Sequence, residues 1–91
     1  MSPYILDEDR PQIKALVEEL VKILKSKGEY NYAMTLLAHM YLLGKDRVCY
    51  VTASDAHGLV CDVAKEFYRV VVAKYEDEKR ALNGPVSELD A

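Results

Sequence analysis

Four residues in the C-terminal half of the chain combine types and spacing that suit recognition of a flat, charged ligand. Tyr68 and Tyr75 are seven residues apart, which places both rings on one face of a helix, while Lys79 extends this row and Arg69 borders it. Aromatic rings stack on flat ring systems, and Lys and Arg hold phosphate through charge-assisted hydrogen bonds. We therefore predict a ligand-binding site made of Tyr68, Arg69, Tyr75 and Lys79. The alternative is that the tyrosines fill a subunit interface and that Arg69 pairs with a nearby carboxylate.

Acid–base and nucleophilic groups occur in the sequence, but their arrangement does not predict catalysis. Ser54, Asp55 and His57 have the residue types of a nucleophilic triad, yet triads are assembled from distant segments so that three side chains converge. Helix capping explains Ser54 and Asp55. Asp62 and Glu66 share a helix face in a pattern similar to the all-α nucleotide pyrophosphohydrolases, but the second acidic motif of those enzymes is missing. We predict no catalytic residue and no enzymatic activity.

His57 and Cys61 offer two metal ligands, because a spacing of four residues puts both on one helix face. His39 or Cys49 would have to complete the set. A structural zinc site uses four ligands, usually with closely spaced cysteine pairs, and this chain has 2 cysteines in all. We therefore predict no metal site and no cofactor, with His39 and Cys61 as ordinary core or interface side chains.

The predicted site lies on the longest helical pattern of the chain, residues 54–84. Ser54 and Asp55 suit its first turn, and Asn83–Pro85 end it, because glycine tolerates left-handed geometry and proline cannot continue a helix. One apolar stripe comprises Ala56, Leu59, Val60, Val63, Phe67, Val70, Val71 and the stem of Lys74. A second comprises His57, Cys61, Tyr68, Val72, Tyr75 and Lys79. One small domain can cover one stripe, so the second needs a partner.

Two shorter helices are predicted before this one. The first, residues 9–27, begins with the capping-box pair Asp9 and Gln12 and has Pro11 in its first turn. The second, residues 29–44, carries apolar side chains on nearly all sides. The remaining segments are predicted as an extended arm (1–8), an ordered linker (45–53) and a flexible tail (85–91).

Helix 29–44 raises the question of what surrounds it. A helix that is apolar on all sides must be covered on all sides, but in a domain of three helices each helix touches only two others. The remaining side must therefore meet the arm or another chain. We predict an all-α domain of three helices with an extended N-terminal arm, in which helices 29–44 and 54–84 form a homo-oligomer interface.

Length and charge narrow the possible partners. Ninety-one residues suit one domain, and no apolar run approaches the ~20 residues that span a bilayer. The net charge of −3 argues against the dense cationic surface that nucleic acid binding requires. The first ten residues carry neither a basic leader nor an apolar export signal. We expect a cytoplasmic protein with reduced cysteines that binds neither nucleic acid nor membrane.

Several segments resemble a known family when they are taken together and in order. They are Tyr4-Ile5, Gly28–Tyr32, Glu66–Arg69, Tyr75–Lys79 and Asn83-Gly84. This arrangement resembles a family of small, functionally uncharacterised proteins of tailed phages, with a pattern of the type GELNY, EFYRR, YEDKK and NGD. The chain departs from that pattern at Tyr30, Val70, Lys74 and Pro85, where the family has leucine, a second arginine, proline and an acid. The missing arginine at position 70 weakens any anion site that the resemblance implies.

Together these observations favour a non-enzymatic binding protein. By analogy with small phage proteins that lack catalytic residues, we expect a counter-defence factor that sequesters a nucleotide immune signal, cyclic or derived from ADP-ribose, between its subunits. The alternative is a protein–protein interaction module that inhibits a host enzyme or regulator. A purely structural or assembly role is the third possibility. In each case the expected location is the host cytoplasm.

Overall fold

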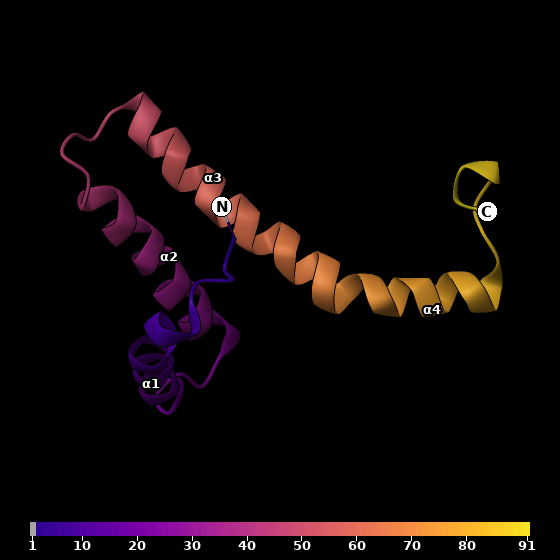
Figure 1. Cartoon of the computed structure of the whole chain (residues 1–91), viewed down its shortest axis with the longest axis horizontal. Coiled ribbons are helices and arrows are strands. Elements are labelled where there is room, and N and C mark those ends of the chain that lie inside the picture. The colour runs from indigo at the N-terminus through magenta and orange to yellow at the C-terminus, as the bar shows by residue number, and fades with distance from the viewer. Residues whose placement is uncertain (1) are drawn as a thin grey trace. The chain divides into compact units, whose positions relative to one another are not determined.

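The computed structural model describes residues 2–91, which are helical without any strand in that range (Figure 1). In chain order the elements are a 3-10 turn (Asp7–Asp9), α1 (Arg10–Val21), α2 (Lys27–Leu43), α3 (Tyr50–Phe67), a π segment (Tyr68–Val72), α4 (Ala73–Asn83) and a second 3-10 turn (Glu88–Asp90). The backbone is helical from α3 through the π segment to α4, so these three elements correspond to the third predicted helix. The predicted all-α class is confirmed.

The chain divides into two compact units by its internal contacts, and the single domain stays a prediction. The first unit ends at Val60, and the second is Cys61–Ala91. The division falls inside α3 and not in a loop. Gly58 lies two residues before the division, but the helix continues through it.

The border between α1 and α2 lies several residues before the predicted one. Ser26 adopts an extended conformation and its hydroxyl accepts a hydrogen bond from the Glu29 amide at 3.1 Å, which makes Ser26 the N-cap of α2. The Glu29 carboxylate in turn accepts a hydrogen bond from the Lys25 amide at 2.6 Å. Lys27, which we had assigned to the end of the first helix, and Gly28 therefore belong to the first turn of α2.

The start of α1 combines a correct and an incorrect expectation. Pro11 lies in the first turn, as predicted, where its missing amide has no helical partner to lose. The expected Asp9 capping box is not formed, because within residues 2–91 the Asp9 side chain accepts no capping hydrogen bond. The preceding 3-10 turn and a hydrogen bond of 2.9 Å from Arg10 Nε to the Ile5 carbonyl order the arm here.

The α2–α3 connection is shorter than the predicted linker, because α3 begins at Tyr50 and not at Ser54. The Thr52 hydroxyl donates to the Arg47 carbonyl at 2.8 Å and accepts from the Cys49 amide at 3.0 Å. These bonds bring the incoming chain into the first helical turn, so residues 50–53 of the predicted linker belong to α3.

Three side chains fasten α2 to the start of α3 within the first unit. The Tyr41 hydroxyl donates to Asp55 Oδ2 at 2.6 Å, and Lys45 Nζ lies 3.5 Å from the same oxygen and 4.2 Å from the centre of the Tyr41 ring. The hydrogen bond from Tyr41, followed by the charge of Lys45, lowers the pKa of Asp55. Asp55 therefore connects two helices. Our prediction that it caps a helix is wrong.

The π segment is the main departure from regular geometry. The Ala73 amide donates to the Tyr68 carbonyl, five residues back, where an α-helix would bond four residues back. In Figure 1 the helix axis of the second unit turns at this point. α4 then ends at Asn83, and Gly84 adopts a φ of 88°, which confirms the predicted stop signal.

The tail after Gly84 forms a turn rather than the expected flexible end. The Ser87 hydroxyl accepts from the Leu89 amide at 3.1 Å, while the Asp90 carboxylate accepts from the amides of Val86 and Ser87 at 3.0 Å each. These two amides, and then the charge of Arg80, lower the pKa of Asp90. Ser87 and Asp90 thus form a capping box that the sequence analysis missed.

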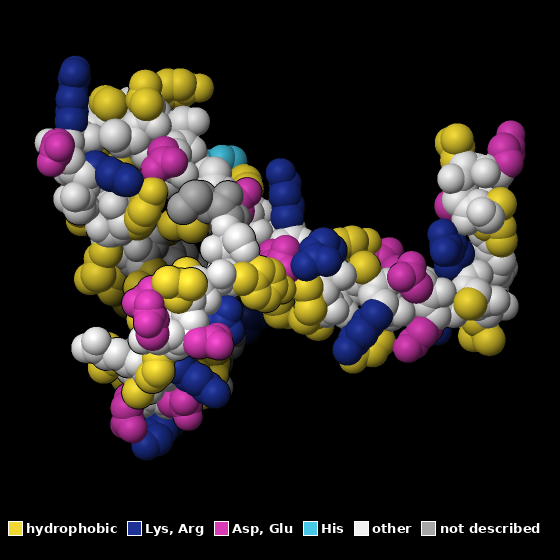
Figure 2. All heavy atoms as spheres, in the orientation of Figure 1, with side chains coloured by type: hydrophobic (Ala, Val, Ile, Leu, Met, Phe, Trp, Pro, Cys, Tyr) yellow, Lys and Arg dark blue, Asp and Glu magenta, His cyan; other side chains and the backbone are white. Residues whose placement is uncertain are grey.

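Neither unit has a conventional core. Among residues 2–91, Ala56 is the one hydrophobic residue that is buried, at 7% exposure. Large apolar side chains of α1, α2 and α3 remain exposed, as do Tyr4, Ile5 and Leu6 of the arm (Figure 2). Apolar surface of this extent normally lies against another molecule.

Candidate functional site

The π segment decides which predicted site residues lie together. A π turn holds one residue more than an α turn, so every residue after it is rotated by about 100° relative to an uninterrupted α-helix. Tyr68 stands before this insertion and Tyr75 after it. Their spacing of seven residues therefore no longer places both rings on one face. The Tyr68 hydroxyl instead donates a short hydrogen bond to Glu76, eight residues on.

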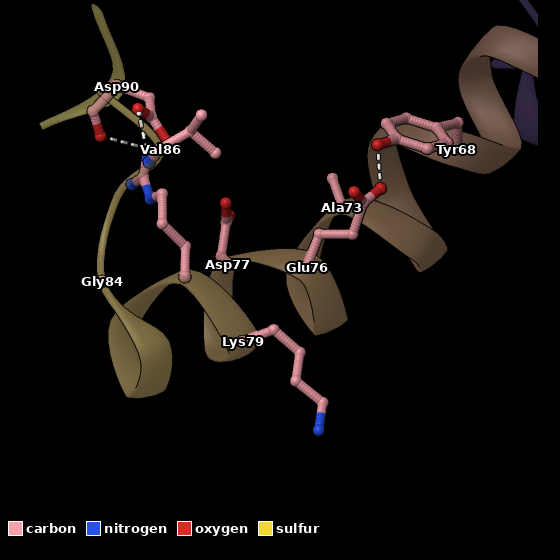
Figure 3. Close-up of a pocket in the computed structure, with 9 residues that line it drawn as sticks. Tyr68, Ala73, Glu76, Asp77, Lys79, Gly84, Val86 and Asp90 are labelled. Atoms are coloured by element: carbon pink, nitrogen blue, oxygen red, sulfur yellow. Dashed lines mark hydrogen bonds between the residues drawn. The ribbon is translucent and has the colours of Figure 1, made fainter. Parts of the chain in front are cut away.

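A shallow groove of about 500 Å³ lies in the second unit between α4, the π segment and the tail (Figure 3). Its lining consists of Tyr68, Ala73, Glu76, Asp77, Lys79, Arg80, Gly84, Val86 and Asp90. Arg80 Nη1 donates to the Asp90 carbonyl at 3.1 Å and holds the tail against α4. Figure 3 shows the Lys79 side chain extending away from the tail, while Glu76 reaches toward Tyr68.

The charge of the groove does not favour an anion. Three carboxylates (Glu76, Asp77 and Asp90) face two cations (Lys79 and Arg80). Glu76 and Asp90 are engaged by hydrogen bonds, whereas within residues 2–91 no hydrogen bond or ion pair holds Asp77 or Lys79. The lining therefore includes one carboxylate, that of Asp77, and one lysine side chain, Lys79, that are not held within the described part of the chain.

Arg69 lies outside the groove and is already paired. Its guanidinium donates two hydrogen bonds to the Glu66 carboxylate, from Nη2 at 2.6 Å and from Nε at 3.2 Å. This fork-to-fork geometry is the strong form of an Arg–carboxylate pair. A phosphate would have to replace Glu66, so the interaction that we weighed as the alternative role of Arg69 is the one that the structure contains.

The structure thus brings two of the four predicted site residues to one groove. Tyr68 and Lys79 line it, while Arg69 and Tyr75 do not. Tyr75 lies instead beside Lys74, whose Nζ is 5.1 Å from the centre of the ring. Glu76, Asp77, Arg80 and Asp90 are additional lining residues. The charged run Tyr75–Arg80 signalled the first three weakly, since such runs usually indicate a solvated helix face, and nothing in the sequence analysis signalled Asp90.

The other candidate groups stay separate from this groove. Within residues 2–91, no three His, Cys, Asp or Glu side chains lie close enough to hold a metal ion. Asp55 is committed to Tyr41, as described above. Hydrogen bonds from Thr52, first through its amide and then through its hydroxyl, lower the pKa of Cys49 at the start of α3.

The helices define a small all-α protein with exposed apolar helical faces and one shallow groove in the second unit. Residues 1–86 match the family described as Domain of unknown function (DUF6899), so the chain belongs to this family. No curated protein and no solved structure matches the chain. The resemblance to proteins of tailed phages stays a prediction.

None of the helices in the described part of the chain is both long and apolar enough to cross a membrane.

Proposed function

We propose that this protein is a non-enzymatic interaction protein that assembles with copies of itself and binds a host protein through its remaining helical surface. The observation that carries the proposal is that Ala56 is the one buried hydrophobic residue within 2–91, while large apolar side chains on every long helix are exposed. In this proposal the protein is phage-encoded and acts in the host cytoplasm as an inhibitor of an enzyme or regulator. Its activity requires no catalytic residue, cofactor or metal.

The surface of α2 supports a protein partner. Tyr32 and Leu43 lie on one side of this helix and Leu37 on another, and each of the three is more than 60% exposed. Flexible Met34 and Met40 lie on the same helix and are also exposed. Exposed aromatic, leucine and methionine side chains are typical of protein interfaces and uncommon on isolated surfaces.

Light scattering and affinity capture test this proposal together. Purified protein at micromolar concentration should elute as an oligomer of defined mass. When it is used as bait in a bacterial lysate, it should retain one protein in stoichiometric amount, and Leu37→Glu should abolish that capture. A monomer that retains no protein would contradict the proposal.

Sequestration of a nucleotide between subunits is the second candidate, because Tyr68 and Lys79 line one groove. A second copy would have to supply further cations, since the carboxylates outnumber the cations in this groove and Arg69 is held by Glu66. Calorimetric titration with cyclic nucleotides and ADP-ribose derivatives tests it directly. Lys79→Glu should then weaken binding at least tenfold, whereas Lys65→Glu, on α3, should not.

A further inference from the structure

The extra residue of the π segment has a second effect, which concerns the apolar stripe of the second unit. In an uninterrupted α-helix, the row through Phe67 would continue at Val70, Lys74, Glu78 and Ala81, of which Lys74 and Glu78 are charged. With one residue inserted, the same face continues at Val71, Tyr75, Lys79 and Leu82. The insertion thus leaves one charged residue in the row, Lys79, instead of two, and adds the larger apolar side chains of Tyr75 and Leu82.

The result is one apolar row along the second unit, the seam, made of Val63, Phe67, Val71, Tyr75, Lys79 and Leu82. Its spacings match the three- and four-residue steps of a helix–helix seam once the inserted residue is discounted. The row extends over about 28 Å at the rise of an α-helix. Phe67, Tyr75 and Leu82 are 60%, 57% and 77% exposed, so the seam is bare in the isolated chain.

The residues of the seam from Val63 to Lys79 are spaced symmetrically about Val71. Phe67 and Tyr75 lie at equal distances on either side of Val71, and Val63 and Lys79 lie at equal distances farther out. If a second copy lies antiparallel, Phe67 faces the partner's Tyr75, and the long stem of Lys79 covers the partner's Val63. A symmetric contact of this kind is self-complementary.

The charge of Lys79 argues against a parallel arrangement of the two helices. Parallel pairing would place Lys79 against the partner's Lys79 within an apolar seam, where like charges repel and water is removed. Antiparallel pairing separates the two ammonium groups to opposite ends. It also places the N-terminal end of each helix beside the C-terminal end of the other, so the two helix dipoles attract each other.

We infer that the seam binds a second copy of this chain in antiparallel orientation, with the two-fold axis at Val71. This inference deepens the proposed function, on which it rests, by naming the face, the orientation and the register of one self-contact. The π segment acts as the device that makes this contact possible, because it places the apolar residues of α4 in line with those of α3.

Cysteine cross-linking tests the register. In a chain carrying Cys49→Ser and Cys61→Ala, Val71→Cys should give a disulfide-linked dimer upon mild oxidation, since only residues near the axis bring two Cα atoms within the ~7 Å that a disulfide requires. Phe67→Cys or Tyr75→Cys alone should cross-link several-fold less. A mixture of these two chains should form the heterodimer. Lys65→Cys, on the opposite face of α3, is the matched control and should not react.

Each other outcome overturns the inference. Efficient cross-linking of Phe67→Cys with itself would show parallel pairing. An oligomer in light scattering without cross-linking at Val71 would overturn the seam and leave the assembly of the proposed function intact. A folded monomer, verified by circular dichroism, would overturn both.

Discussion

The helical repeat is regular in the part of α3 that belongs to the first unit and is interrupted in the second unit. Up to Val60 the α-helical repeat holds, and the residues that it predicts for the inner face, Ala56 and Leu59, are buried and half-buried. After Phe67 the repeat changes, because the π segment adds a residue. The difference shows that a periodic pattern assigns faces correctly only up to the first inserted residue. Beyond it, the pattern assigns residues to the wrong face of the helix, as it did when it placed Tyr75 on the face of Tyr68.

The strongest test of this difference is to place a charge on the seam. Phe67→Glu should raise the dissociation constant of the self-contact by more than ~100-fold, because truncating a central interface anchor costs about 2–4 kcal/mol and an added buried charge costs more. Sedimentation velocity over a dilution series measures this constant. Lys65→Glu adds the same side chain on the opposite face and should leave the constant within about threefold, by analogy with near-neutral peripheral contacts. Equal effects of both variants would contradict the seam.

Deleting one residue sharpens the comparison further. Removal of Val70 should convert the π segment to regular α-helix while keeping Phe67 and Tyr75 on one face. We expect the assembly to survive with its affinity changed less than about tenfold, because the seam stays aligned. Removal of Ala64, outside the π segment, should rotate Val63 away from the rest of the seam by about 100° and abolish assembly. Light scattering distinguishes the two variants, and loss of assembly in both would argue against our account of the insertion.

A smaller effect is expected in the first unit, where the α-helical repeat is regular. Gly58 lies inside α3, and a methyl group added there would meet no described atom within 4 Å. Gly58→Ala should therefore raise the free energy of unfolding by about 0.5–1 kcal/mol, since glycine loses the most conformational freedom in a helix. Urea denaturation gives this value. The reverse change Ala81→Gly in α4 should lower it by a similar amount, and a destabilising Gly58→Ala would indicate a close neighbour at this site.

The smallest expected effect is the pH response of the α2–α3 fastening. The pKa of Asp55 is lowered from 3.8 in the folded chain, so the folded state releases this proton more readily than the unfolded state. The stabilisation is therefore complete above pH ~4 and is lost as the pH falls through the lowered pKa. Hydrogen exchange of the amides around Tyr41 and Asp55 should accelerate in that range. Asp55→Asn should remove this acid dependence, and an unchanged profile would show that the contact is unimportant.

The class of fold was predictable because it depends on local signals that tolerate errors of a few residues. Helical spacing, Pro11 near the start of α1, and Gly84 after α4 gave the number and order of the helices. Boundaries failed where a side chain competed with the main chain. Ser26 could not be distinguished from a residue within the first helix, and the hydroxyl of Thr52 turned a β-branched stretch into the first turn of α3.

The candidate site was predictable in its residue types and only partly in its geometry. Tyr68 and Lys79 do line one groove, but Arg69 pairs with Glu66 three residues before it, a contact that any exposed helix can form. The separation of Tyr68 from Tyr75 follows from the π segment. No residue type marks such an insertion, because it results from packing and hydrogen bonds that are absent from a linear pattern.

The burial of Ala56 alone among residues 2–91 has a consequence for how the protein would exist in a cell. If the chain assembles as proposed, it draws its stability from association, and folding and assembly become one equilibrium. Its melting temperature should rise with the amount of protein, and newly made chains should remain open to proteolysis until enough copies have accumulated. Abundance itself would thus set the fraction of molecules that can act.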